Sequence, residues 1–110
     1  MPNAHEYRDG AARFRALGDV YLRQAALVSG WPVASHLGAG PVADAVSAGL
    51  GRSAGELVDA AAEMARLAGV CDTRAEVCEA YRRRVVEYER DPLLRLALAR
   101  PVPPYPWVSW

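Results

Sequence analysis

The chain has 110 residues, enough for one domain, and its 13 basic and 13 acidic residues leave a formal net charge of zero. This balance removes any global attraction to nucleic acid or anionic lipid, so we expect no nucleic-acid partner and no stable membrane insertion. The first ten residues include Glu6, Arg8 and Asp9 and lack the apolar stretch of a cleavable signal peptide.

Residues 4–28 are predicted to form a first helix. Asn3 is a suitable N-cap with Glu6 as its capping partner, and Gly30 and Pro32 are typical of a helix end. Apolar side chains recur every seven residues, as a helix needs to bury one stripe. The stripe comprises Tyr7, Phe14, Tyr21 and Val28, with Ala11, Leu17 and Ala25 beside it.

The middle of the chain is rich in glycine and proline. Residues 33–40 are predicted to be a loop, and Pro41 suits the first turn of a short helix over 42–50. Ser53 and Glu56 match a capping box, so we expect the helix to kink or restart at Ser53.

Residues 54–90 are predicted to form a long helix, because a second seven-residue repeat runs through them. One line holds Leu57, Met64, Cys71, Cys78 and Val85, and its companion holds Ala60, Leu67, Tyr81 and Tyr88, interrupted by Arg74. A break at Asp72 is an open alternative, but the repeat keeps its phase there and favours one continuous helix.

Asp91 and Pro92 end this helix, and a final short helix over 93–100 is an open alternative. Residues 101–110 contain four prolines and three aromatic residues, which predicts an extended tail. The chain is thus divided into a helical domain over 1–100 and a Pro-rich aromatic tail over 101–110. Whether the tail covers its own domain or binds another protein's groove stays open.

The fold is predicted to be all-α: an antiparallel helical hairpin of two long helices, with short extra helices as an option. Such a packing device usually binds partners, so we expect a protein partner, which is either a second copy or a different chain. The residues expected to bind it are Phe14, Leu17, Tyr21, Trp31, Leu57, Met64, Leu67, Tyr81, Val85, Tyr88, Tyr105, Trp107 and Trp110.

Several short patterns resemble catalytic or ligand sites but lack the context that those sites need. Gly51–Gly55 matches the G-x-S-x-G nucleophile elbow, which requires a preceding strand and a parallel sheet. Gly38–Ala43 resembles a dinucleotide fingerprint without its βαβ unit. The two cysteines and two histidines lack the spacing of a zinc site. We therefore expect no enzyme activity, no metal and no cofactor.

Cys71 and Cys78 are seven residues apart, which separates them by about 10 Å along a helix and prevents a mutual disulfide. We expect two small, buried thiols. An intermolecular disulfide or redox switch is the open alternative.

The run from Ala65 to Tyr81 resembles the second helix of small actinobacterial proteins of type VII (ESX-type) secretion, in the branch similar to the excreted ESX virulence factor. The Pro-rich end, closing in Pro106-Trp107-Val108, is also similar to tails in that group. Two features depart from the family. Its Trp-x-Gly bend is replaced by Gly30-Trp31, and its Tyr-x-x-x-Asp/Glu export signature is missing, since Tyr81 is followed by Val85 and Tyr88 by Pro92.

The resemblance implies a non-catalytic hairpin that associates with another helical hairpin in a type VII secretion-associated complex, or that is itself secreted. The alternative is a cytoplasmic antitoxin, immunity or chaperone-like protein that masks a cognate protein. We expect a cytoplasmic location, with type VII export as the open alternative.

Overall fold

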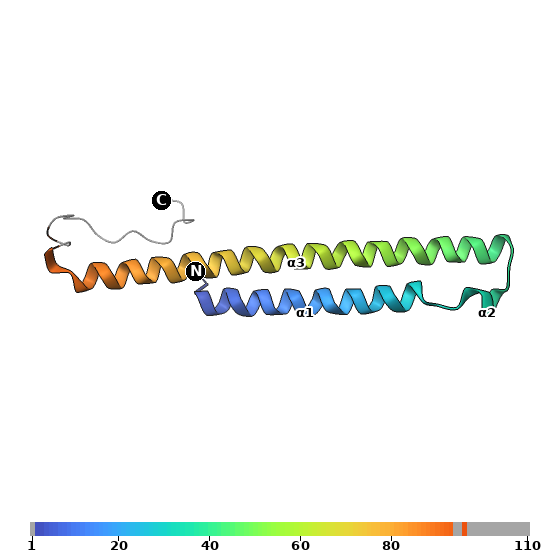
Figure 1. Ribbon diagram of the computed structural model, residues 1–110, viewed down its shortest axis with the longest axis horizontal. Helices are drawn as coiled ribbons and strands as arrows, with labels where there is room; N and C mark the ends of the chain where they lie inside the picture. The colour runs from blue at the N-terminus through green and yellow to red at the C-terminus, as the bar shows by residue number, and fades with distance from the viewer. Residues whose placement is uncertain (1, 94–95, 97–110) are drawn as a thin grey trace.

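The computed structural model describes residues 2–93 and residue 96 and shows two long antiparallel helices joined by a short one (Figure 1). Helix α1 spans Ala4–Ser29, α2 spans Val33–Leu37 and α3 spans Pro41–Arg90, with no strand among the described residues. The predicted all-α antiparallel hairpin is confirmed. Its two arms are unequal, because α1 has 26 residues and α3 has 50.

Helix α1 begins and ends almost where the sequence predicts. The Asn3 side-chain oxygen accepts a hydrogen bond from the Glu6 backbone N–H at 2.9 Å, which satisfies one of the unpaired donors of the first turn. At the other end, the Gly30 N–H donates to the Ala26 carbonyl at 3.0 Å. Local capping therefore sets both ends of α1.

The predicted loop over 33–40 is wrong for Val33–Leu37, which form α2. The chain reverses only after this short helix, at Gly38 and Gly40, whose φ angles are +70° and +118°. Residues with a side chain rarely adopt such angles, so these two glycines are what the turn requires. The bend is therefore shorter than expected, and α2 packs along the start of α3.

The predicted restart at Ser53 is also wrong, since α3 is continuous from Pro41 to Arg90. Each interior glycine costs a helix about 1 kcal/mol relative to alanine, but burial of Ala43 and Ala54 on one face holds this segment in the hairpin. Continuity across Asp72 is confirmed. There the Thr73 hydroxyl donates to the Gly69 carbonyl at 3.0 Å, within the helix, instead of capping a new one.

The hairpin is packed on small residues. Seven buried positions recur at seven-residue intervals and form what we call the alanine seam: Ala11, Gly18 and Ala25 of α1, and Ala54, Ala61, Ala68 and Ala75 of α3. A Cβ atom placed on Gly18 would lie 3.5 Å from the Ala61 carbonyl oxygen. The two backbones are thus close enough that only alanine or glycine fits between them.

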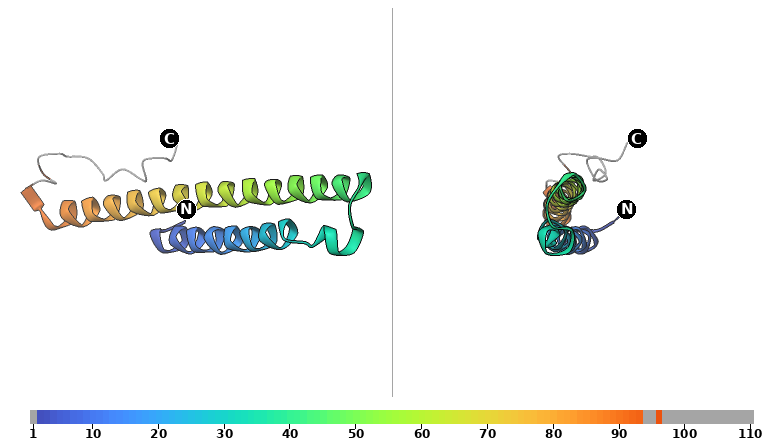
Figure 2. Two further views of the ribbon diagram at one scale, coloured as in Figure 1. Left: turned by 45° about the vertical axis from the view of Figure 1, so that its right-hand side comes forward. Right: turned by 90° about the vertical axis from the view of Figure 1, so that its right-hand side faces the viewer.

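Helix α3 continues well beyond the start of α1, as Figure 1 and the left view of Figure 2 show. The Cys78 Sγ lies 4.0 Å from the Pro2 carbonyl oxygen, so the first residues of α1 lie beside Cys78. Residues 80–90, which we call the overhang, therefore have no part of α1 opposite them. The molecule is a rod of 81 × 21 × 15 Å, and α3 alone accounts for most of its length.

Candidate partner-binding surface

Some of the predicted partner-binding residues lie where α1 and α3 run side by side. They flank the alanine seam and do not form its centre. Most of them are half-buried: Phe14, Tyr21, Leu57, Met64 and Leu67. Leu17 is more open, with 40% of its surface exposed. These side chains seal the hairpin from the sides, so a partner can reach only their outer edges.

The remaining predicted residues fall into three places. Tyr81, Val85 and Tyr88 are half-buried on the overhang. Trp31 lies at the bend, 41% exposed and stacked on His36 with ring centroids 4.8 Å apart. Tyr105, Trp107 and Trp110 lie outside the described residues. The structure therefore does not gather the predicted residues into one surface.

One edge of the hairpin carries ion pairs between the two long helices. The Arg8 guanidinium donates to Glu79 at 3.0 Å, and Arg15 donates to the Asp72 carboxylate. Arg8 also lies 3.8 Å from Asp72. Each arginine is seven residues from the next, as are the two acids, so successive pairs step along the hairpin by one heptad. We call this side of the molecule the ladder edge.

The same steps continue toward the bend with apolar and small residues. One heptad beyond Arg15 and Asp72 lie Leu22 and Ala65, and Val58 follows another heptad on. Leu22 is 49% exposed and Val58 is 48% exposed. The ladder edge is thus ion-paired in one half and apolar in the half near the bend.

These exposed residues were not predicted. The prediction named large apolar residues that a hairpin would bury. Leu22 and Val58 lie beside the seam, at the exposed edge of the hairpin. A signal was present, because Arg8, Arg15 and Leu22 are seven apart, as are Val58, Ala65, Asp72 and Glu79. The two series lie on one edge only because of the way α1 and α3 are aligned, and the alanine seam is what defines that alignment.

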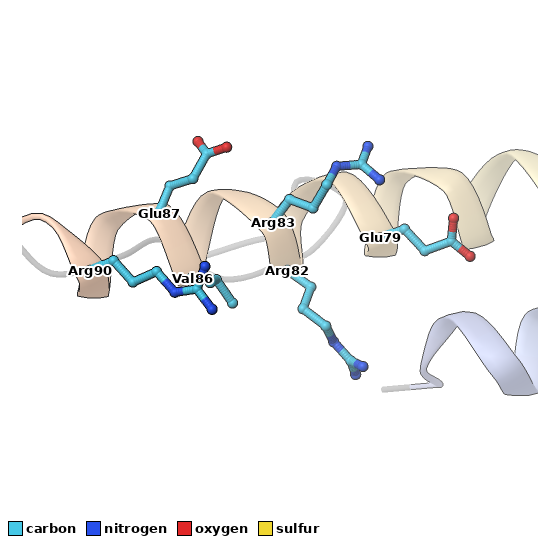
Figure 3. Close-up of a pocket in the computed structure, with 6 residues that line it drawn as sticks. All are labelled: Glu79, Arg82, Arg83, Val86, Glu87 and Arg90. Atoms are coloured by element: carbon cyan, nitrogen blue, oxygen red, sulfur yellow. The ribbon is translucent and has the colours of Figure 1, made fainter.

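The overhang carries a shallow hollow of about 480 Å³ (Figure 3). Its lining consists of Glu79, Arg82, Arg83, Val86, Glu87 and Arg90. The Glu79 carboxylate is paired with Arg8 of α1. The hollow therefore presents the guanidinium groups of its three arginines and one other carboxylate, that of Glu87. Figure 3 shows Arg83 and Glu87 extending to one side of this face and Arg82 to the other, with Arg90 between them beside Val86, so these charges do not converge on one point.

The motifs that resemble catalytic sites lie in helical or bend segments. Ser53 and its flanking glycines are inside α3, where Ser53 is exposed, and not at a strand-to-helix turn. Gly38 and Gly40 form the bend after α2. No three histidine, cysteine or acidic side chains gather as a metal site within residues 2–93.

The two cysteines are free thiols that face α1, and of the two thiols predicted to be buried only Cys78 is buried. Cys78 is 3% exposed, and this burial raises the pKa of its thiol. Cys71 is half-buried, and its Sγ would lie 3.6 Å from a Cβ placed on Gly10. The thiols therefore fill space where glycine and alanine bring the helices close.

Comparison with protein-family models, with curated proteins and with solved structures found no match to this chain. The helices that the structure describes include none that is long and apolar enough to cross a membrane.

Proposed function

We propose that this protein is a non-catalytic helical hairpin that binds another protein through the apolar side chains that its two helices leave exposed. The observation that carries the proposal is the composition of its core. The buried residues are alanine, glycine and cysteine, and no large side chain in the described part of the chain is fully buried. Leucine, valine and tryptophan side chains are left on the surface.

The total accessible surface supports the same conclusion. The chain exposes 7885 Å², whereas a compact monomer of 11.9 kDa exposes about 6,000 Å². Burial of roughly 800 Å² on each partner is sufficient for a stable complex. The surface that the chain exposes beyond that of a compact monomer is therefore larger than the area that one partner buries in a stable complex.

The exposed apolar residues favour the half of the hairpin near the bend. There they include Leu17, Leu22, Leu27, Trp31, Leu37, Val42 and Val58. The opposite half is crossed by the Arg8–Glu79 and Arg15–Asp72 pairs, which are hydrated and give little binding energy. A partner should therefore dock mainly on the bend half.

We place this hairpin in a type VII secretion-associated complex, as a component or as a secreted protein. The support is the resemblance of the segment from Ala65 to Tyr81, together with an all-α hairpin that has a tryptophan next to its bend. The missing export signature favours a member that leaves the cell with a partner bearing that signal.

The test is affinity capture of the tagged full-length protein from lysate of the source organism, with mass spectrometry of the bound proteins. A variant lacking residues 101–110 is captured in parallel, because loss of the partner would assign recognition to the tail. Recovery of a small helical protein or a secretion ATPase would support the proposal. Recovery of a toxin or enzyme would instead favour the masking regulator.

Location separates the same two functions. The tagged protein is followed in lysate and medium, with a cytoplasmic marker to detect lysis. Its appearance in the medium without the marker is expected for type VII export. Strict retention together with a captured toxin would overturn the secretion assignment.

A further inference from the structure

We propose that the hollow on the overhang is the docking site for this chain's own Pro-rich aromatic tail, residues 101–110. The tail would lie across Val86, with its aromatic rings against the guanidinium groups of the flanking arginines. This proposal goes beyond the proposed function and does not depend on it. A partner is expected on the bend half of the hairpin, whereas the hollow lies at the opposite end of α3.

The first argument is the chemistry of the hollow. Val86 is 36% exposed and has an arginine four residues away on either side, Arg82 and Arg90 (Figure 3). The methylene stems of these arginines are apolar and extend the apolar surface around Val86. Their guanidinium groups stack on aromatic rings. A surface that is apolar at its centre and cationic at its sides therefore suits an uncharged segment rich in aromatic residues.

The second argument is the composition of the tail. Residues 101–110 contain no charged side chain, so they bring no positive charge to the three arginines of the hollow. They do contain Tyr105, Trp107 and Trp110, whose rings attract guanidinium groups. The four prolines of the tail restrict its backbone in advance, which lowers the entropy that docking removes.

The third argument is the place where α3 ends. Val86 lies five residues before Asp91, which is about 8 Å along the helix axis. The Asp91 backbone is extended, and its carboxylate accepts a hydrogen bond from the Leu93 N–H at 3.0 Å, so the chain turns away from the helix axis here. Residues 94–106 can span about 40 Å when extended, far more than the return to the hollow requires.

The fourth argument is the tether between the hollow and the tail. A segment joined by a short linker is present at its site at an effective concentration of about millimolar, without any new contact. An acidic segment of another protein would also suit the arginines, but it lacks this advantage. A protein that binds the aromatic tail must therefore first displace it from the overhang.

The experiment measures tryptophan fluorescence of the full-length protein with the substitution Trp31→Phe. The remaining tryptophans of this protein, Trp107 and Trp110, both lie in the tail, and phenylalanine keeps an aromatic ring beside His36. Acrylamide quenching reports how far solvent reaches the two indoles, and a synthetic peptide of residues 101–110 gives the value for an undocked tail. Quenching of the protein is expected to be weaker than that of the peptide at every protein concentration, because the docking is intramolecular.

The test variant adds Val86→Glu to the Trp31→Phe protein. Glutamate is a better helix former than valine and lies four residues from both Arg82 and Arg90, so it removes the apolar centre and pairs with the arginines while α3 stays helical. The matched control is Val42→Glu, the same substitution at a 69% exposed position in the first turn of α3. Val86→Glu is expected to raise quenching to the value of the peptide, and Val42→Glu to leave it unchanged. Circular dichroism verifies that helix content is the same in all three proteins.

The outcomes decide both the docking and its place. Quenching of the Trp31→Phe protein equal to that of the peptide would overturn the proposal, because the tail would then be undocked. Protection that persists in Val86→Glu, or that is lost equally in Val42→Glu, would overturn the hollow as the site. Protection that appears only at high protein concentration would indicate docking on a second copy and would also overturn it. Capture of a protein partner is a separate result, so failure here leaves the proposed function standing.

Discussion

Gly18 faces Ala61 across the hairpin so closely that a Cβ on Gly18 would lie 3.5 Å from the Ala61 carbonyl oxygen. This distance is ordinary van der Waals contact for one added carbon but leaves no room for a larger side chain. The relationship defines the helix spacing for the whole molecule, because the same small residues recur at each heptad of the seam.

Replacement of Gly18 by alanine should therefore stabilise the protein, by about 0.5–1 kcal/mol, because alanine is the better helix former and its methyl group fits. Gly18→Leu should destabilise it by about 1–3 kcal/mol through overpacking. Urea unfolding followed by circular dichroism, at one protein concentration, measures both changes. Wild-type stability in Gly18→Leu would mean that the helices are not in close contact at this position.

Ala68, which is completely buried in the seam, should not tolerate leucine. We expect Ala68→Leu to lower the free energy of unfolding by about 1–3 kcal/mol, because the added volume must push α1 and α3 apart. Ala62→Leu is the control, since Ala62 is exposed on the same helix and the same substitution there should change stability by less than about 0.5 kcal/mol. Equal effects at the two positions would contradict the assignment of the seam.

The Arg15–Asp72 pair should contribute only modestly to stability. The Arg15 side chain is 56% exposed and that of Asp72 is 28% exposed, and ion pairs of this kind contribute about 0.2–1 kcal/mol. A double-mutant cycle with Arg15→Gln and Asp72→Asn isolates the coupling energy. We expect it to shrink in 1 M NaCl because salt screens exposed charges. A coupling that salt does not change would indicate that the pair is shielded from solvent.

Cys78 should make stability depend on pH in alkaline solution. Burial raises the pKa of its thiol above the 9.0 of a fully hydrated thiol, so the folded protein holds this proton more tightly than the unfolded chain does. The contribution of the protonated Cys78 thiol to the free energy of unfolding is complete below pH 9 and is lost as the pH rises through its pKa in the folded protein.

Urea unfolding of wild type and Cys78→Ala across this pH range tests that dependence. The free energy of unfolding of the wild type should fall more steeply above pH 9 than that of the variant. All other side chains are shared by the two proteins, so the difference between the two curves isolates the effect of Cys78. Parallel curves would contradict a buried, protonated thiol.

The ends of the helices were predictable because each depends on a few neighbouring residues. Asn3 caps α1 in the predicted way, and α3 ends before Asp91 and Pro92, as predicted. The restart at Ser53 was wrong because a local capping pattern competes with packing along α1. That packing is a long-range term, so short motifs in this segment were a poor guide.

The centre of the core was missed for a different reason. Large apolar residues were predicted to form the core, whereas the hairpin buries the alanines at 54, 61, 68 and 75 and leaves leucines half-buried or exposed. Alanine is common on exposed helix faces too, so its repeat is conspicuous only when matched with Ala11, Gly18 and Ala25 on the other helix. The alignment of these two repeats decides which side chains remain exposed. The exposed surface was therefore not predictable from either repeat alone.

The unequal lengths of α1 and α3 also determine how the backbone amides of the long helix exchange with solvent. Between Ala54 and Ala75 every turn of α3 is packed against α1, so opening an amide there requires separation of the two helices. Amides in the overhang, which has no part of α1 opposite it, can open by local unwinding from the C-terminal end of α3. Deuterium uptake should therefore rise along one continuous helix, from the slowest amides beside Ala68 to the fastest beyond Cys78, with no change in secondary structure marking the boundary.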